Sequence, residues 1–241
     1  MKRRGMTRIW LGAALATVMS LVTAPSAAHG DSGGGGRCSG GYAAITFDDG
    51  PTADTPAYLE ALRDAGDVRA TFFVLGSRAA ERPELTRLIA EDGHRIGNHT
   101  YTHPNLVALD PAAAFAELRD TSRVVRRQTD RAPRLFRPPF GSTDARTRQD
   151  AARLGMTEVI WTVDTVDWSG ISADTIAANA LTVRPGGIIL LHDGLRTTLD
   201  AIPKIVAGLA ERKMCAGRIV YSKEPVQAWP GLTFHAKAAR W

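Results

Sequence analysis

Short apolar runs alternate with amphipathic helical segments along most of this chain, and this alternation restricts the possible folds more than any other feature. The apolar runs predict strands at Tyr42–Phe47, Thr71–Leu75, Arg95–Gly97, Leu135–Arg137, Thr157–Val163 and Gly187–Leu191. Helical patterns lie between and after them at Thr55–Ala65, Pro83–Glu91, Pro111–Gln128, Thr143–Leu154, Ser172–Leu181 and Thr198–Arg212. Strands and helices of this size in alternation are typical of parallel βα units. The sequence therefore predicts an α/β fold, a closed or nearly closed barrel, with Asp110 as an N-cap.

The two ends of the chain differ from this pattern. A basic start, an apolar run over Ile9–Val22 and small residues at Ser26–Ala28 predict a signal peptide over residues 1–28. A membrane anchor is the alternative, but the apolar run is too short for a comfortable span. A flexible glycine-rich leader is expected over 29–37, one catalytic domain over 38–222 and a C-terminal tail over 223–241. We expect a secreted, extracellular monomer with no membrane contact in its mature form.

Net charge excludes an obvious polyanion partner. The chain has 30 basic and 25 acidic residues, a formal charge of +5, but residues 1–28 contain four basic residues and no acid. The rest therefore carries only +1, too little for a nucleic-acid footprint, and we expect no nucleic-acid partner.

Only two cysteines are present, Cys38 and Cys215. In an exported chain, two cysteines at opposite ends of a domain favour a disulfide. Two unrelated buried thiols are the alternative. A metal site is not indicated, because neither cysteine has another ligand at suitable spacing.

Polar residues follow the predicted strands at the point where each strand ends. They are Asp48 and Asp49, His99 and His103, Arg137, Asp164 and Asp167, and His192 and Asp193. In parallel α/β folds, catalytic groups gather at the carboxyl ends of the strands. Scattered surface charges would not be expected to choose these positions, so the pattern predicts a site there.

The residue types suggest metal-assisted chemistry. If Asn98–His103 makes a helical turn, the imidazoles of His99 and His103 project from one face, as in known zinc sites. Together with Asp49 they would leave an open coordination position, which is typical of a catalytic site. Taken alone, Asp48 and Asp49 also fit a solvated turn, and an isolated histidine pair is only suggestive.

His192 needs a partner before it suggests catalysis. A lone histidine at a strand end is more often a core residue, but Asp164 or Asp167 beside it would fix its tautomer and raise its pKa. Trp168 fits either the core or an apolar wall for a sugar ring or methyl group.

Taken together, the clusters resemble the polysaccharide deacetylases, the NodB-homology family also called carbohydrate esterase family 4. The resemblance extends from about Cys38 to Cys215 and rests on five motifs in order: Thr46–Pro51, His99–His103, Arg137–Gly141, Asp164–Trp168 and Leu191–Asp193. Each is weak alone, whereas five in this order and spacing are specific. Compact secreted acetylxylan esterases and chitooligosaccharide deacetylases are the most similar members.

The resemblance implies a distorted (β/α)7-type barrel and a role for each motif. Asp49, His99 and His103 would bind a divalent metal, usually Zn²⁺, although the same ligands can hold Co²⁺ or Ni²⁺. Asp48 would be the general base, paired with Arg137, and His192 the general acid, paired with Asp167. The backbone N–H of Phe140 would stabilise the oxyanion, and Trp168 and Leu191 would form the pocket for the acetyl methyl. Phe140 replaces a tyrosine common in the family, and Asp164 has no assigned role beyond a structural cap.

The function implied is removal of N-acetyl groups from an acetylated polysaccharide of N-acetylglucosamine, such as chitin oligosaccharides or peptidoglycan. O-deacetylation of xylan is the main alternative, because it presents the same acetyl carbonyl. A non-catalytic carbohydrate-binding protein on the same fold is a further alternative, disfavoured because all five motifs keep their chemical residues.

Overall fold

The computed structural model describes residues 38–220 and the backbone of 232–235. All of these belong to one compact unit, Gly35–Trp241. The predicted signal peptide and leader lie outside the described residues, as does the tail apart from that four-residue strand. Within the described part of the chain, no helix is long and apolar enough to cross a membrane.

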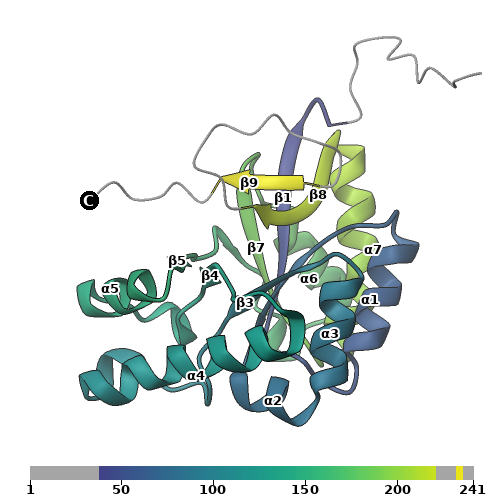
Figure 1. The fold of residues 1–241 in the computed structure, drawn as a ribbon. Helices are drawn as coiled ribbons and strands as arrows, with labels where there is room; N and C mark the ends of the chain where they lie inside the picture. Colours follow the sequence, from purple (N-terminus) through teal and green to yellow (C-terminus); the bar gives the residue numbers. More distant parts are fainter. Residues whose placement is uncertain (1–37, 221–231, 236–241) are drawn as a thin grey trace, which may run out of the picture. The chain divides into compact units, whose positions relative to one another are not determined.

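A parallel sheet forms the centre of the unit (Figure 1). Its strands are β1 (Gly41–Asp48), β2 (Thr71–Val74), β3 (Arg95–Asn98), β4 (Leu135–Phe136), β5 (Thr157–Glu158), β6 (Val163–Asp164) and β7 (Gly187–His192). Their order is β5-β4-β3-β2-β1-β7-β6. Among the described residues β5 and β6 do not pair with each other, so the sheet is a curled half-barrel. This confirms the predicted α/β class and distorted barrel.

Two further strands extend the sheet beside β1. β8 (Met214–Val220) pairs in parallel with the first half of β1, and β9 (Leu232–His235) pairs in parallel with β8. The sequence pattern misses both strands. β8 places Cys215 opposite Tyr42, and a disulfide joins Cys38 to Cys215 with their Cα atoms 5.2 Å apart. The predicted covalent link between the two ends of the domain is therefore present.

Seven helices lie around the sheet in the described part of the chain (Figure 1). They are α1 (Thr55–Asp64), α2 (Gly76–Glu81), α3 (Pro83–Glu91), α4 (Pro111–Thr129), α5 (Ala145–Arg153), α6 (Ala173–Ala180) and α7 (Arg196–Glu211), with one-turn 3₁₀ helices at η1 (Leu106–Ala108), η2 (Pro139–Gly141) and η3 (Asp167–Ser169). The Asp110 carboxylate accepts the N–H groups of Ala112 and Ala113 at 3.0 Å, as expected of an N-cap.

The single strand predicted over Thr157–Val163 is wrong. The first part of this segment pairs with β4 as β5, whereas its last part pairs with β7 as β6. Between them the chain exchanges one hydrogen-bonding partner for the other: Val159 N donates to Phe136 O and Thr162 N donates to Ile188 O. Local residue type does not reveal such a break, because the break is set by which neighbouring strand each part pairs with.

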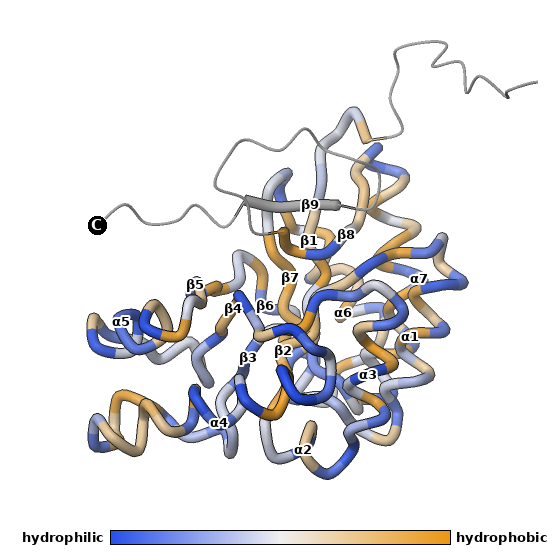
Figure 2. The backbone as a smooth tube through the Cα atoms, viewed as in Figure 1, coloured by the Kyte–Doolittle hydropathy of each residue, from blue (hydrophilic) through white to orange (hydrophobic). Residues whose placement is uncertain are grey.

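Alternation along β1 separates the core from the site. Ala43, Ile45 and Phe47 pack with the helices in the main hydrophobic cluster, and all three are essentially inaccessible to solvent. Figure 2 shows the hydrophobic residues running along β1 and β7. Successive side chains of a strand point to opposite faces, so Thr46 and Asp48 lie on the concave side. The packing of Phe47 against Tyr58 and Phe72 thereby fixes the direction of the Asp48 carboxylate.

The buried His94 should make stability depend on pH. Its Nδ1 accepts the N–H of Ala70 at 2.9 Å, and burial, with a smaller effect from Arg69, lowers its pKa from 6.5 to about 4. Between these values the unfolded chain binds the proton more tightly than the folded chain, so stability is complete above pH 6.5 and is lost as the pH falls. We expect the free energy of unfolding to drop by up to about 3 kcal/mol from this group. Urea unfolding of wild type and His94→Gln at pH 7 and pH 4 measures this drop in the free energy of unfolding. Equal pH dependence in both proteins would show that His94 is not its source.

Candidate active site

Two neighbouring carboxylates leave the end of β1 in a geometry that lets them converge. Side chains of consecutive strand residues diverge, but Asp49 has a left-handed backbone conformation with φ 70°. This turn brings Asp49 Oδ1 to 3.5 Å and Asp48 Oδ2 to 3.6 Å from the same atom, Nε2 of His99. Aspartate tolerates positive φ better than most residues, which fits it to this position.

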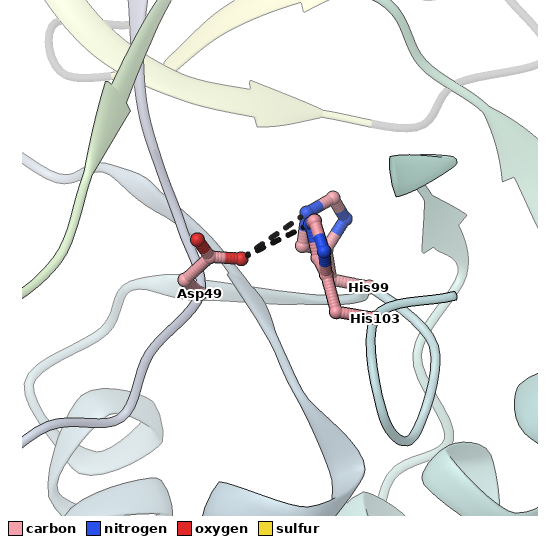
Figure 3. Close-up of side chains that lie close together, drawn as sticks. All are labelled: Asp49, His99 and His103. Atoms are coloured by element: carbon pink, nitrogen blue, oxygen red, sulfur yellow. Dashed lines mark ion pairs between the residues drawn. The ribbon is translucent and has the colours of Figure 1, made fainter. Parts of the chain in front are cut away.

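His99 and His103 come together in a loop, and the helical turn considered for Asn98–His103 is wrong. Thr100 and His103 have φ angles of 70° and 65°, and the Thr100 hydroxyl accepts the N–H of His103 at 3.1 Å. The two imidazole rings end 5.0 Å apart. Figure 3 shows both rings directed at the Asp49 carboxylate, which comes from a different loop. The two histidines therefore converge because the loop folds back on itself, and not because a spacing of four residues places them on one face of a helix.

The three side chains fit a divalent metal. Asp49 Oδ1 is buried without a hydrogen-bond partner among the described residues and lies 3.5 Å from Nε2 of both histidines. The three ligand atoms all lie within 4.8 Å of one another. Nδ1 of His99 is 2.7 Å from the carbonyl oxygen of Arg137, so it must carry the proton and leave Nε2 with a free lone pair. Burial lowers the pKa of His99 to about 3, which keeps the ring neutral.

Arg137 and Asp48 form a buried ion pair. Arg137 Nη1 donates to Asp48 Oδ1 and to the Thr46 hydroxyl, both at 2.8 Å, and neither charged side chain is more than 3% exposed. The guanidinium also lies over the ring of Phe73, 4.2 Å from its centroid. Burial raises the pKa of Asp48, while the charge of Arg137 opposes that shift. The pair holds the Asp48 carboxylate in one orientation beside the ligand set.

Asp167, from η3, fixes the imidazole of His192. Its Oδ1 lies 2.7 Å from His192 Nδ1, and its Oδ2 accepts the backbone N–H of His192 at 2.8 Å and the hydroxyl of Thr198 at 2.6 Å. Burial lowers the pKa of His192, but the hydrogen bond and charge of Asp167 outweigh it, with help from Asp48 and Asp49, and leave it raised. His192 is also the register partner of Asp48 in the sheet. An acid with a raised pKa therefore lies next to the carboxylate pair.

Exposed aromatic side chains border this arrangement. Phe140 has a left-handed φ of 59°, is 69% exposed and packs its ring on His103, with the centroids 4.7 Å apart. Trp168, next to Asp167, is 62% exposed, and so it is not a core residue. Asp164 accepts the N–H of Val166 at 2.8 Å, which is a local cap. Solvent reaches both rings, as a contact with substrate requires.

Leu191 is not brought to the site. It is fully buried and packs with the helix-facing core cluster, because it alternates with His192 along β7. Leu190, two residues before His192, shares the concave face: it is the register partner of Thr46, whose hydroxyl contacts Arg137. A strand period of two would have predicted Leu190 in place of Leu191.

Two further carboxylates, to which the sequence assigns no role, support the site. Glu117 on α4 accepts the N–H groups of Tyr101 and Thr102 at 2.6 and 2.7 Å and so holds the histidine loop. Asp193 accepts the hydroxyls of Thr55 and Thr52 at 2.6 and 2.9 Å and fixes the turn after β1. In the sequence, Glu117 is indistinguishable from any surface glutamate of an amphipathic helix.

Comparison with known proteins gives one consistent result. The sequence model of the family described as polysaccharide deacetylase matches residues 36–159. A peptidoglycan-N-acetylglucosamine deacetylase from Bacillus cereus is 41% identical over 172 residues, covering 69% of this chain and 62% of that protein. A bifunctional xylanase/xylan deacetylase from Cellvibrio japonicus is 37% identical over 186 residues, covering 77% of this chain and 28% of that protein.

The chain thus spans less than two thirds of the length of these two curated relatives. Among solved structures, a family 4 carbohydrate esterase from Streptomyces lividans in complex with acetate superposes with a TM-score of 0.72 and 42% identity, covering 75% of this chain and 93% of that one. By its five motifs, its fold and these matches, the chain belongs to the polysaccharide deacetylase family.

Proposed function

We propose that this protein is a secreted, metal-dependent deacetylase that hydrolyses N-acetyl groups of N-acetylglucosamine polymers and releases acetate. The observation that carries the proposal is the juxtaposition of three elements: the Asp49, His99 and His103 ligand set, the Asp48–Arg137 pair and the Asp167–His192 pair. The amide-cleaving activity in the name of the Bacillus cereus relative supports the same reaction.

Asp49, His99 and His103 would hold Zn²⁺, since two imidazole nitrogens and one carboxylate oxygen suit that ion. A divalent metal in such a site supplies Lewis-acid activation of water and of the acetyl carbonyl. The unpartnered Asp49 Oδ1 and the neutral His99 are the features that fit it. The same ligands can also hold cobalt or nickel, so zinc is proposed as the usual metal of the family that the motifs resemble.

Asp48 would act as the general base that takes a proton from the attacking water. Arg137 orients this carboxylate, and its positive charge favours the ionised form that a base requires. The backbone N–H of Phe140 would donate to the oxygen of the acetyl group as negative charge develops there. This donor belongs to the backbone, so a phenylalanine serves as well as a tyrosine at position 140.

His192 would act as the general acid that protonates the leaving nitrogen of the sugar. It must be charged before the reaction, and its pairing with Asp167 raises its pKa toward that requirement. Trp168 would form one wall of the pocket for the acetyl methyl. The second apolar wall is proposed as Leu190, since Leu191 is turned into the core.

The main alternative is ester hydrolysis on acetylated xylan. The Cellvibrio japonicus relative, named a xylan deacetylase, favours it, and both substrates present the same carbonyl. Secretion is proposed from the sequence of residues 1–28, and the Cys38–Cys215 disulfide supports an oxidising compartment. We propose a monomer that acts on an acetylated polysaccharide without a nucleic-acid or membrane partner.

Acetate release tests the proposal directly. Chitooligosaccharides and acetylated xylan are incubated with the protein, with and without a chelator. Chelator-sensitive release that is faster from chitooligosaccharides supports the proposal, and faster release from xylan supports the ester alternative. A protein that binds metal but releases acetate from neither polymer would direct the search to peptidoglycan. No metal and no release would favour the non-catalytic alternative.

The pairing of Asp167 with His192 predicts a pH effect. Because Asp167 raises the pKa of His192, Asp167→Asn should move the alkaline limb of the kcat profile to lower pH, where the neutral histidine can no longer donate a proton. At neutral pH we expect kcat to fall at least about tenfold. The control is Asp164→Asn, an exposed aspartate of the same motif whose local cap an asparagine can keep. An unmoved alkaline limb in Asp167→Asn would contradict the assignment of His192 as the acid.

A further inference from the structure

A second concave site lies at the other edge of the sheet, where the strands begin. It is a cavity of about 530 Å³. Its lining residues come from the carboxyl ends of α3 and α4 and the starts of β3 and β4, elements that are labelled in Figure 1. Its size is in the range of small-molecule pockets. Two acidic residues, Glu91 and Asp130, line it together with five arginines: Arg87, Arg95, Arg131, Arg134 and Arg218. We call it the arginine cavity; its ionisable lining carries a net charge of +3 at neutral pH.

Ion pairing within the protein does not account for the arginines of this cavity. Within residues 38–220, none of the five forms an ion pair with a carboxylate. The Nε atoms of Arg95 and Arg218 are buried without any hydrogen-bond partner there. A buried donor without a partner costs stability, so such atoms call for an explanation.

Mutual repulsion adds to this cost. Burial and the positive charges of Arg218, Arg131 and Arg134 lower the pKa of Arg95. Arginine nevertheless keeps its proton in proteins, so the charges remain and repel one another. An anion in the cavity would relieve both the repulsion and the missing hydrogen bonds.

Capping of helix ends does not account for the cluster. Arg218 does donate to the carbonyl oxygen of Gly93, just after α3. The other four guanidinium groups donate to no backbone carbonyl in the described part of the chain, although α3 and α4 both end nearby. Helix capping therefore leaves the other four guanidinium groups available to a ligand.

We propose that the arginine cavity binds a small molecule that bears a phosphate group, with Arg95 and Arg218 donating to its oxygens and Arg131 and Arg134 closing the rim. Arginine forms paired hydrogen bonds with both carboxylates and phosphates. A phosphate carries more charge and three terminal oxygens, so it can engage several guanidinium groups at once, whereas a carboxylate has two oxygens. The excess of three positive charges matches the more highly charged group.

Calorimetric titration of the metal-loaded full chain tests this proposal, with inorganic phosphate and glucose 6-phosphate as probes at constant ionic strength. We expect Arg95→Gln to weaken binding of both probes by at least about tenfold, the loss of one charge-assisted hydrogen bond. Arg134→Gln, an exposed rim residue that can be replaced without disturbing the core, should weaken it several-fold. The matched control is Arg153→Gln, which removes the same charge from an exposed position on α5 outside the cavity and should bind like wild type.

Three outcomes would overturn the proposal. Equal affinity in wild type, Arg95→Gln and Arg134→Gln would place any bound phosphate elsewhere, for example on the metal ion of the deacetylase site. Absence of binding up to about 10 mM of either probe would exclude a site of useful strength. Citrate binding tenfold tighter than both probes would assign the cavity to carboxylates. Acetate release by Arg134→Gln should stay at the wild-type rate, because the cavity and the deacetylase residues lie at opposite ends of the strands.

Discussion

Asp48→Asn should reduce kcat for acetate release by about 10² to 10⁴-fold, the usual contribution of a general base. Metal content should stay near the wild-type value, because Asp48 is not one of the three converging ligands. Asparagine keeps the shape of the side chain and can still accept from Arg137, but it cannot take a proton from water. The measurement is kcat with chitooligosaccharides alongside metal analysis of the same sample.

The substitution also leaves the buried Arg137 charge without its counterion, which can cost about 3–5 kcal/mol of stability. Asp48→Asn/Arg137→Met removes that unpaired charge and still lacks the base, so it should be folded and equally inactive. Asp164→Asn, the exposed aspartate outside the carboxylate pair, should keep wild-type turnover. Loss of metal from Asp48→Asn in a folded protein would mean that the roles of Asp48 and Asp49 are wrong.

Local sequence signals account for much of the fold. Pro83 begins α3 and Gly93 follows its end, so the predicted helix and the observed one have the same bounds. Long-range pairing is harder to predict, because β5 and β6 are separated by a change of hydrogen-bonding partner that only the assembled sheet defines. β8 escapes prediction for the same reason, since its pairing with β1 joins segments far apart in the chain.

The candidate site shows the same division between local and long-range information. Strand ends predict that Asp48, Arg137 and His192 lie close together, since parallel strands finish at one edge of the sheet. They do not predict how His99 and His103 converge, which depends on positive φ angles at Thr100 and His103 and on Glu117 from a distant helix. Strand alternation does predict the side-chain directions along β7, because it places Leu190, two residues before His192, on the concave face and Leu191 on the opposite face.

His103→Ala should lose both metal and activity. His103 supplies one of only two nitrogen ligands in the set, and its Nε2 lies 3.5 Å from the unpartnered Asp49 oxygen. Losing a group that merely supports a ligand weakens metal binding by about 10–100-fold, so losing the ligand itself should weaken it by more than about 100-fold. The side chain is 27% exposed, and its truncation should leave the fold intact. Competition with a chromophoric chelator measures the affinity, and acetate release measures the activity.

His94→Gln is the matched control for this substitution. His94 is a buried histidine whose Nδ1 accepts the N–H of Ala70, just before β2 and away from the ligand set. Its replacement should alter acid stability while metal affinity and acetate release stay at wild-type values. A folded His103→Ala protein that kept one tightly bound metal per chain would remove His103 from the ligand set, and with it the open-sided coordination on which the proposed hydrolysis depends.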